Sequence, residues 1–303
     1  MSSISGARIR RAITVGLTTG AMITAGAIAA APAQAVTVPT ITAKGGFVMN
    51  GATGATLYTK YGDTKRLTAS TTKIMTAKVV LSRLSPATSV TLDTKVTIRR
   101  EVSDYMVAEG YPSSARLIVG DKVTVRQLLY GMMLPSGCDA AMALADKFGT
   151  GTTVKARTAN FIARMNNMAK TLGMTNTHFD SFDGLSNGAN YSTPRDLTKL
   201  GRSTMTSATF RAVVKTKSYT AKTITSSGST RTMAPWNNTN TLLGWNGTLG
   251  VKTGSGPDAK YCLVFSATLN GEQVVGAVLS SSSEANRTAD VKKLITYGYA
   301  RIS

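Results

Sequence analysis

A serine and a lysine stand three residues apart in Ser70-Thr71-Thr72-Lys73. In a helix this spacing places both side chains on one face, one turn apart. A neighbouring lysine can act as the base for a serine nucleophile when burial or other cations lower its pKa. About one such pair is expected by chance in a chain of this size, so alone the motif equally fits a capped helix with an exposed lysine.

A second candidate is Lys252-Thr253-Gly254, which lies in a predicted strand and is followed by Ser255. Lysine and threonine offer a charge and a hydroxyl to a carboxylate. Glycine in a strand lets a ligand backbone approach closely. The alternative is an ordinary strand end that runs into a turn.

A third candidate, Ser136-Gly137-Cys138, follows Leu134-Pro135 at the start of a predicted helix. Taken alone, the serine fits the helix N-cap, where a hydroxyl accepts a hydrogen bond from the first turn. This motif matters because it lies between the other two in the sequence, and the order of the three is used below.

Hydrophobic periodicity and turn residues predict the elements that position these motifs. The predicted strands span 45–50, 56–60, 218–225, 248–253, 261–269 and 273–280. The predicted helices span 70–84, 125–134, 136–148 and 161–172, with another that opens at Thr193-Pro194 and a last one over 285–299. This order predicts an α+β fold in which both ends of the chain share one antiparallel sheet and the central helices form an inserted lobe.

The N-terminus has the pattern of a signal peptide. Three arginines within residues 8–11 precede an uncharged, Ala-, Gly- and Thr-rich run over 12–31, which ends at the small-x-small site Ala33-Gln34-Ala35. We expect cleavage near Ala35, leaving 303 − 35 = 268 residues that begin at Val36. An uncleaved anchor is the alternative, disfavoured because the run is poor in Leu, Ile and Phe.

Composition excludes several classes of protein. A hydrophobic content of 42% supports a globular core, which argues against a disordered chain. With one histidine, His178, and two cysteines, a multi-histidine metal centre and a four-cysteine zinc site are excluded. Cys138 and Cys262 are expected to be free thiols, since Cys262 sits within an apolar strand; His178 is interpreted as structural.

The three motifs together occur in the order found in class A β-lactamases and penicillin-binding proteins. On Ala69–Ala77, Leu134–Ala141, Gly250–Gly254 and Thr177-His178-Phe179 with Asp183-Gly184-Leu185, the chain resembles the secreted low-mass penicillin-binding proteins, which are serine-type D-alanyl-D-alanine carboxypeptidases/transpeptidases. The resemblance covers nearly the whole mature chain. It is strongest to the exported actinomycete DD-transpeptidase type that also carries Ser-Gly-Cys.

The resemblance implies a β-lactamase/transpeptidase-like fold, an antiparallel sheet flanked by helices with an inserted all-helical lobe. After a signal peptide over 1–35, a single penicillin-binding transpeptidase domain would span 36–303. Its sheet lobe would comprise about 36–80 plus 215–303, and its helical lobe about 81–214.

The resemblance also implies a catalytic set without metal or cofactor. Ser70 would attack the carbonyl of the penultimate D-alanine, and Lys73 would take its proton. Ser136 would bridge Lys73 and Lys252 and relay a proton to the leaving amine. The acyl group would then pass to an amine or to water.

Further residues are implied to bind the substrate. Lys252 would keep the site positive, and Thr253 would help to hold the terminal carboxylate. Backbone N–H groups of Ser70 and Ser255 would form the oxyanion hole. The implied substrate-binding residues are Cys138, Lys252, Thr253 and Gly254.

Cys138 departs from the family pattern, which usually has asparagine there to hold a substrate carbonyl. A thiol is a poorer donor, so substrate range and the balance of hydrolysis against transfer are expected to differ. With lysines nearby, we expect the Cys138 thiolate to be favoured. No Glu-x-x-Leu-Asn segment supplies a deacylating base, so efficient β-lactamase activity is not expected.

The expected partners are peptidoglycan stem peptides as substrate and β-lactams as covalent inhibitors. The predicted net charge of the mature chain is 32 − 15 = +17. We expect this charge to keep the protein soluble and to attract it loosely to an anionic cell wall. Nucleic-acid binding is disfavoured because no aromatic-basic stacking motif is found. We expect a secreted, wall-associated monomer without a stable membrane anchor. The rival hypotheses are a non-catalytic β-lactam sensor and a wall-binding protein with a dead site.

Overall fold

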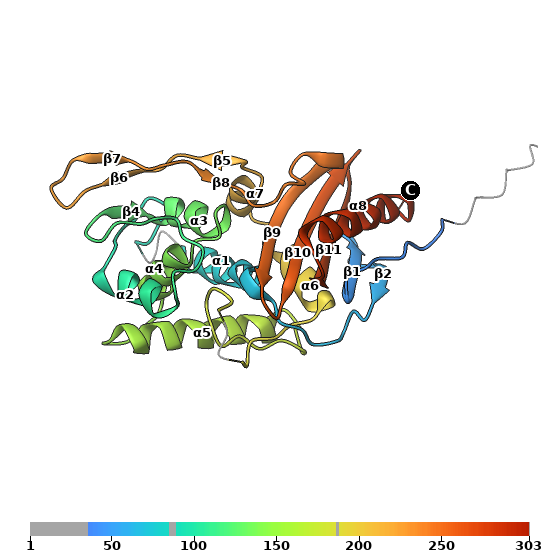
Figure 1. Cartoon of the computed structure of the whole chain (residues 1–303), viewed down its shortest axis with the longest axis horizontal. Coiled ribbons are helices and arrows are strands. Elements are labelled where there is room, and N and C mark those ends of the chain that lie inside the picture. The colour runs from blue at the N-terminus through green and yellow to red at the C-terminus, as the bar shows by residue number, and fades with distance from the viewer. Residues whose placement is uncertain (1–35, 85–88, 186–187, 303) are drawn as a thin grey trace, which may run out of the picture. The chain divides into compact units, whose positions relative to one another are not determined.

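The computed structural model describes residues 36–84, 89–185 and 188–302, and the predicted signal peptide lies outside these ranges. Five strands form the main sheet, in the order β2-β1-β11-β10-β9 with every pair antiparallel (Figure 1). They are β1 (Gly45–Asn50), β2 (Thr56–Lys60), β9 (Thr248–Gly256), β10 (Lys260–Leu269) and β11 (Glu272–Ser281). The prediction that both ends of the chain share one antiparallel sheet is confirmed.

Helices flank this sheet, and smaller strands lie beside the helices (Figure 1). The helices are η1 (Ala69–Thr72), α1 (Lys73–Ser82), α2 (Arg100–Ala108), α3 (Val125–Met133), α4 (Cys138–Phe148), α5 (Val154–Thr171), α6 (Pro194–Thr204), α7 (Ala208–Val214), η3 (Trp245–Gly247) and α8 (Glu284–Ala300). A four-stranded sheet joins β3 (Lys95–Thr97), β4 (Lys122–Thr124), β6 (Lys222–Ile224) and β7 (Thr230–Thr232). A two-stranded sheet joins β5 (Ser218–Tyr219) and β8 (Trp236–Asn237).

The alternation of side chains along the central strands gives the main sheet two apolar faces. Leu263 and Phe265 of β10 pack in one cluster with Leu294 of α8. Val264, between them, packs in the other cluster with Leu197 of α6. Helices α8 and α6 therefore cover opposite faces of the sheet, which explains why β10 and β11 read as near-continuous hydrophobic runs.

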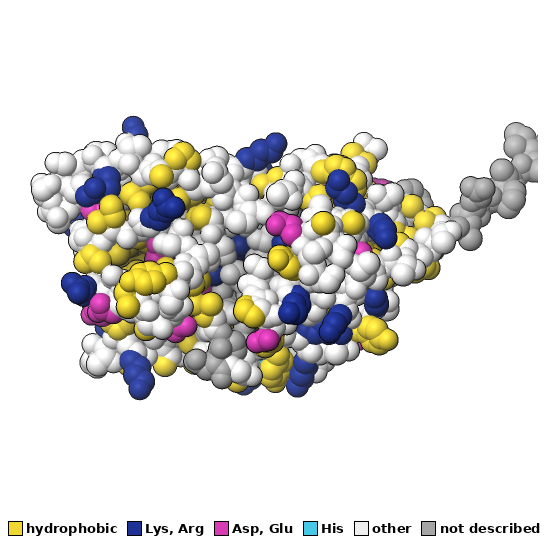
Figure 2. Space-filling model, in the orientation of Figure 1, with side chains coloured by type: hydrophobic (Ala, Val, Ile, Leu, Met, Phe, Trp, Pro, Cys, Tyr) yellow, Lys and Arg dark blue, Asp and Glu magenta, His cyan; other side chains and the backbone are white. Residues whose placement is uncertain are grey.

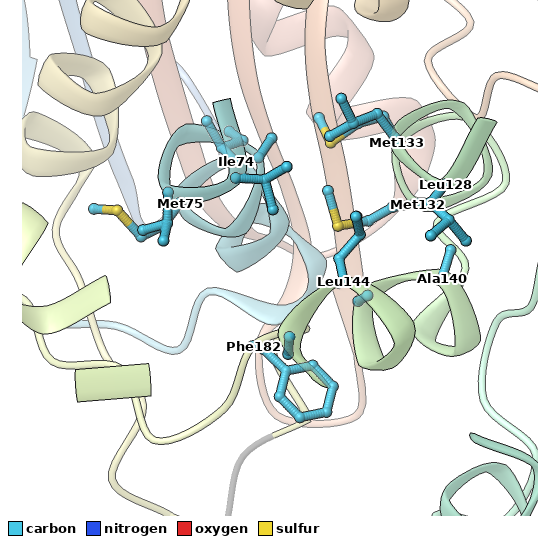
Figure 3. Packing of buried hydrophobic residues seen from close by; sticks show 14 of the residues in the cluster. Ile74, Met75, Leu128, Met132, Met133, Ala140, Leu144 and Phe182 are labelled. Atoms are coloured by element: carbon cyan, nitrogen blue, oxygen red, sulfur yellow. The ribbon is translucent and has the colours of Figure 1, made fainter. Parts of the chain in front are cut away.

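Helix α1 contributes Ile74 and Met75 to the larger core, and Figure 3 shows them near side chains of α3 and α4. Ile74 and Met75 are fully buried, and burial of each such side chain stabilises the fold by about 1.5–3 kcal/mol. The side chains that meet this region come from α3, α4 and the loop after α5: Leu128, Met132, Met133, Ala140, Leu144 and Phe182. Seven of the ten residues of α1 are buried, polar Lys73 and Thr76 among them, so packing on most of its surface holds the Ser70–Lys73 segment in place.

Several predicted boundaries were wrong, for local reasons. The predicted helix 70–84 begins as the 3-10 turn η1, because Ala69 takes a positive φ of 44°, and α1 ends at Ser82. The predicted helix 136–148 begins only at Cys138, since Ser136 has φ 66°. The predicted strand 218–225 is split into β5 and β6.

Two segments pack against the lobe other than the one to which the sequence assigned them. Helix α6, placed by sequence in the helical lobe, packs on β11 and β1 of the main sheet. Strands β6 and β7, placed in the sheet lobe, pair with β4 instead. Along the described residues no helix is both long and apolar enough to cross a lipid bilayer.

Candidate active site

Strand β9 lies directly against η1, and Gly254 permits this contact. A Cβ atom at Gly254 would lie 2.9 Å from the carbonyl oxygen of Thr68 and 3.2 Å from the backbone nitrogen of Ser70. A side chain there would push β9 away from the turn. The sequence suggested that this glycine admits a ligand backbone, whereas the structure shows that it admits the turn that carries Ser70.

Ser70 and Lys73 are in direct contact, as their spacing predicted. Lys73 Nζ donates a hydrogen bond to Ser70 Oγ at 2.9 Å. The same Nζ donates to the carbonyl oxygen of Asp183 at 3.0 Å and to Cys138 Sγ at 3.3 Å. Lys73 is fully buried, so these three acceptors hold its amine against the serine.

The loop that contains Asp183 supports this arrangement from the other side. Tyr105 Oη donates to Asp183 Oδ2 at 2.6 Å, and the Leu185 N–H donates to Asp183 Oδ1 at 3.0 Å. Burial and the neighbouring carboxylate raise the pKa of Tyr105, which keeps it a donor. Gly184 follows with φ 93°, and a Cβ atom there would collide with the carbonyl oxygen of Ala69.

Lys252 is buried behind the cleft wall. Its Nζ lies 3.4 Å from Thr253 Oγ1, which in turn lies 2.6 Å from Thr239 Oγ1. Burial, with the charge of Lys73 acting in the same direction, holds the pKa of Lys252 well below its ordinary value. We expected Lys252 to keep the site positive, but burial disfavours the charged form of its side chain.

Ser136 does not form the bridge between Lys73 and Lys252 that the resemblance implied. Its hydroxyl is buried and has no hydrogen-bond partner among the described residues. Lys73 already donates to Ser70, Cys138 and the Asp183 carbonyl, which explains why the bridge is missing. The Ser136 hydroxyl is therefore a buried, unpaired polar group in a residue that lines the cleft.

Cys138 lies beside Lys73, and both cysteines are free, as expected. Burial raises the pKa of the Cys138 thiol and outweighs the opposing effect of Lys73. The expectation of a favoured thiolate was therefore wrong, because it counted the nearby charge and not the desolvation of the sulfur. At neutral pH the residue is a thiol.

We expect the native Cys138 thiol to react with a bulky thiol reagent more than about tenfold more slowly than in the denatured chain, because it is buried and protonated. A Cys262→Ala variant reports on Cys138 alone, and absorbance of the released reagent gives the rate. Once modified, the protein should no longer be acylated by penicillin, because Cys138 Sγ contacts Lys73. Fast modification, or unchanged acylation after complete modification, would contradict this prediction.

A cleft of 420 Å³ opens over these groups. Six of the eight predicted site residues line it: Ser70, Ser136, Cys138, Thr253, Gly254 and Ser255. The other two, Lys73 and Lys252, lie just behind its wall and are 0% and 1% exposed. The structure thus brings together motifs that are far apart in the sequence.

The sequence analysis missed Arg287, which comes from α8 and also lines the cleft. Its side chain is buried; Nη2 donates to Glu284 Oε1 at 2.6 Å, while Nε has no hydrogen-bond partner within the described part of the chain. A sequence signal was present, because Arg287 precedes Val291 and Leu294 by four and seven residues and so lies on the apolar face of the predicted helix.

His178 is not among the residues that line the cleft. It pairs through its backbone with Tyr191 in an isolated β-bridge. In residues 36–84, 89–185 and 188–302, no three or more His, Cys, Asp or Glu side chains are grouped so that they could hold a metal ion.

Comparisons with known proteins agree on one family. A family model described as D-alanyl-D-alanine carboxypeptidase matches residues 32–283. The chain is 61% identical over 294 residues to a D-alanyl-D-alanine carboxypeptidase of Streptomyces sp. (strain K15), covering 97% of this chain and 99% of that one. It is 33% identical to DacC of Escherichia coli (strain K12), covering 88% of this chain but only 63% of that longer protein.

Solved structures show the same relationship. The crystal structure of the Streptomyces K15 DD-transpeptidase superimposes with a TM-score of 0.84 at 63% identity, over 88% of this chain and all of the other. DacD from Francisella tularensis gives a TM-score of 0.74 at 29% identity, over 87% of this chain and 71% of the other. The fold predicted from the sequence is thereby confirmed.

Proposed function

Because the chain belongs to the D-alanyl-D-alanine carboxypeptidase family of serine peptidases, we propose that Ser70 is its nucleophile and that it works through an acyl-enzyme on D-Ala-D-Ala-terminated stem peptides. The observation that carries this proposal is the 2.9 Å contact between Lys73 Nζ and Ser70 Oγ on the wall of an open cleft. A serine and its base held at hydrogen-bond distance are the geometric requirement for this chemistry.

In the first step, Ser70 Oγ attacks the carbonyl carbon of the penultimate D-alanine while Lys73 Nζ takes the hydroxyl proton. The backbone N–H groups of Ser70 and Ser255, whose residues both line the cleft, are the proposed donors to the oxyanion. Each such donor typically lowers the barrier by about 3 kcal/mol.

In the second step, the bond to the terminal D-alanine breaks and its nitrogen takes a proton. Ser136 is the proposed relay: its hydroxyl gives a proton to this nitrogen and takes from Lys73 the proton that Lys73 removed from Ser70. Ser136 suits this role because it lines the cleft and its hydroxyl has no hydrogen-bond partner among the described residues. The acyl group remains on Ser70 as an ester. An amine or water then attacks this ester and gives a proton to Lys73, which passes it to Ser70 Oγ as the ester bond breaks. This step completes transpeptidation or carboxypeptidation.

The terminal carboxylate of the donor is proposed to lie near Arg287 and Thr253. Arg287 Nε has no hydrogen-bond partner among the described residues, and both Arg287 and Thr253 line the cleft. A guanidinium that still has N–H groups to offer is well suited to a carboxylate. The donor would then lie between Ser70 and α8.

Arg287→Gln is expected to lower kcat/KM for carboxylate-terminated peptide donors by about 10- to 100-fold, the loss of one charge-assisted hydrogen bond. A thioester donor without a terminal carboxylate is the matched substrate and should lose much less. Thermal melts would show whether the variant is folded. Equal losses for both donors would mean that Arg287 does not bind the carboxylate.

A single set of measurements tests the reaction itself. Intact mass after exposure to benzylpenicillin should rise by one covalent adduct. A D-Ala-D-Ala or thioester donor, with and without an amine acceptor, should give D-alanine or thiol release together with transfer or hydrolysis products. Adduct formation without any product would favour the rival hypothesis of a β-lactam sensor, and no adduct would favour a wall-binding protein with a dead site.

The proposed function also requires that the protein is exported to the compartment of its substrate. Cleavage near Ala35 would release the mature chain to the compartment that holds peptidoglycan. The substrate would be encountered there, and β-lactams would act as covalent inhibitors by acylating Ser70. The loose retention by the wall that we propose should weaken as salt is raised, because it would depend on charge.

A further inference from the structure

A second cavity, of 1040 Å³, is larger than the active-site cleft and shares no lining residue with it. It lies where the β1–β2 turn and the β10–β11 turn meet α6 and the segment that leads into α7. Gly51, Gly271 and Gln273 mark the sheet side of this groove, which we call the basic groove. The reaction assigned to Ser70 makes no use of it.

Four cationic side chains line the basic groove, and none of its lining residues is acidic. Arg195, Lys199 and Arg202 occupy positions i, i+4 and i+7 of α6, which places them on one helix face over about 10 Å. Arg211 of α7 adds a fourth charge. Basic residues are common over the visible surface as well (Figure 2), but this row lines a hollow.

Two of these cations have carboxylate partners. Arg195 pairs with Asp63 at 2.7 Å, and Lys199 pairs with Asp196 at 3.2 Å. These two charges are partly neutralised within the protein. They are therefore weaker attractants for an outside anion than an uncompensated arginine would be.

The other two arginines are held by neutral groups. Arg202 donates to the carbonyl oxygens of Gly51 and Ala52 at 2.7 and 2.6 Å. Arg211 donates to two carbonyl oxygens of the α6–α7 loop at 2.7 and 2.8 Å. Neither forms an ion pair within the described residues, so each guanidinium is fixed in position while its charge remains uncompensated.

We infer that the basic groove binds a linear phosphodiester polymer of a polyol. A preoriented guanidinium with free N–H groups matches phosphate oxygens. A row of cations along a groove matches an anion repeated along a chain. Lining residues with hydroxyl or amide groups are suited to the hydroxyl groups of a polyol; they are Thr56, Ser203, Thr206 and Gln273.

Two other polyanions fit less well. A nucleic acid strand needs exposed aromatic faces on which bases stack, yet the one aromatic lining residue, Phe47, is covered by the Arg195 guanidinium at 4.4 Å. An anionic lipid surface is flat, whereas Arg202 and Arg211 are partly buried in a hollow. A flexible polymer that enters the hollow can reach both.

Binding there would hold the protein on an anionic polymer while the Ser70 cleft stays open, because the two cavities are separate. The inference does not depend on the reaction at Ser70, and a catalytically inactive protein should bind equally well.

The test uses the full mature chain and a fluorescent oligomer of six glycerol-phosphate units, with binding followed by fluorescence anisotropy over a range of salt concentrations. Arg202→Gln/Arg211→Gln should weaken binding by at least about tenfold and flatten its salt dependence. Lys95→Gln/Lys155→Gln removes the same net charge from exposed positions outside the groove and should change the affinity less than about twofold. Thermal melts fix a temperature at which every variant is folded.

Several results would overturn the inference. Equal weakening by both double variants would mean that net charge alone attracts the polymer. Tighter binding of a single-stranded oligonucleotide of equal charge, or of phosphatidylglycerol vesicles, would assign the groove to another partner. If Arg202→Gln prevents folding, Lys199→Gln/Arg211→Gln leaves the β1–β2 turn intact, and unchanged binding in that variant would also count against the groove.

Discussion

Ser70→Ala is expected to abolish covalent labelling by benzylpenicillin, because it removes the hydroxyl that Lys73 Nζ contacts at 2.9 Å on the cleft wall. The loss should be complete within detection, since no residual path to the ester exists without a nucleophile. Intact mass spectrometry gives the extent of labelling, and peptide mapping of the wild-type adduct gives its position.

The matched control is Ser82→Ala, the same substitution at the exposed far end of α1. It should label like the wild type. An adduct mapped to any serine other than Ser70, or labelling that survives in Ser70→Ala, would sink the assignment of the nucleophile.

Lys73→Met is expected to slow acylation by about 10²–10⁴-fold, the usual contribution of a positioned general base. The unbranched methionine keeps most of the buried volume, so the fold should survive. Stopped-flow or time-resolved mass measurements of penicillin acylation give the rate. Circular dichroism melts distinguish a slow enzyme from an unfolded one.

Lys78→Met provides the control on the same helix, because Lys78 donates to the Ser203 carbonyl and does not line the cleft. Its acylation rate should stay close to that of the wild type. Were the two lysine variants equally slow, Lys73 would be acting through the stability of α1 and not as the base.

Much of the site could be predicted because most of its residues belong to short sequence motifs. The Ser70–Lys73 contact follows from helical spacing alone, and the strand that carries Lys252 follows from its β-like pattern. That these segments meet, however, depends on contacts between residues far apart in the chain. Gly254 illustrates this, since only the structure shows that it lies against the Ser70 turn.

The errors have a common physical cause. Backbone exceptions, such as the positive φ of Ala69 and Ser136, are imposed by tertiary contacts and leave little trace in hydrophobic periodicity. The residue types alone also do not show how deeply the Cys138 and Lys252 side chains are buried. For that reason the charges near Cys138 and Lys252 were given too much weight, and desolvation too little.

The order of strands in the main sheet has a consequence for the timing of folding on the ribosome. β1 ends at residue 50 and its partner β11 begins at residue 272, so the partner is made 272 − 50 = 222 positions later. Until then β1 and β2 form a lone hairpin, which is marginally stable in water. Asp290 of α8 then accepts hydrogen bonds from Thr42 and Ala43, just before β1. A nascent chain therefore carries Ser70 and Lys73 long before it can fold around them, and reactivity should arise only after translation has passed α8.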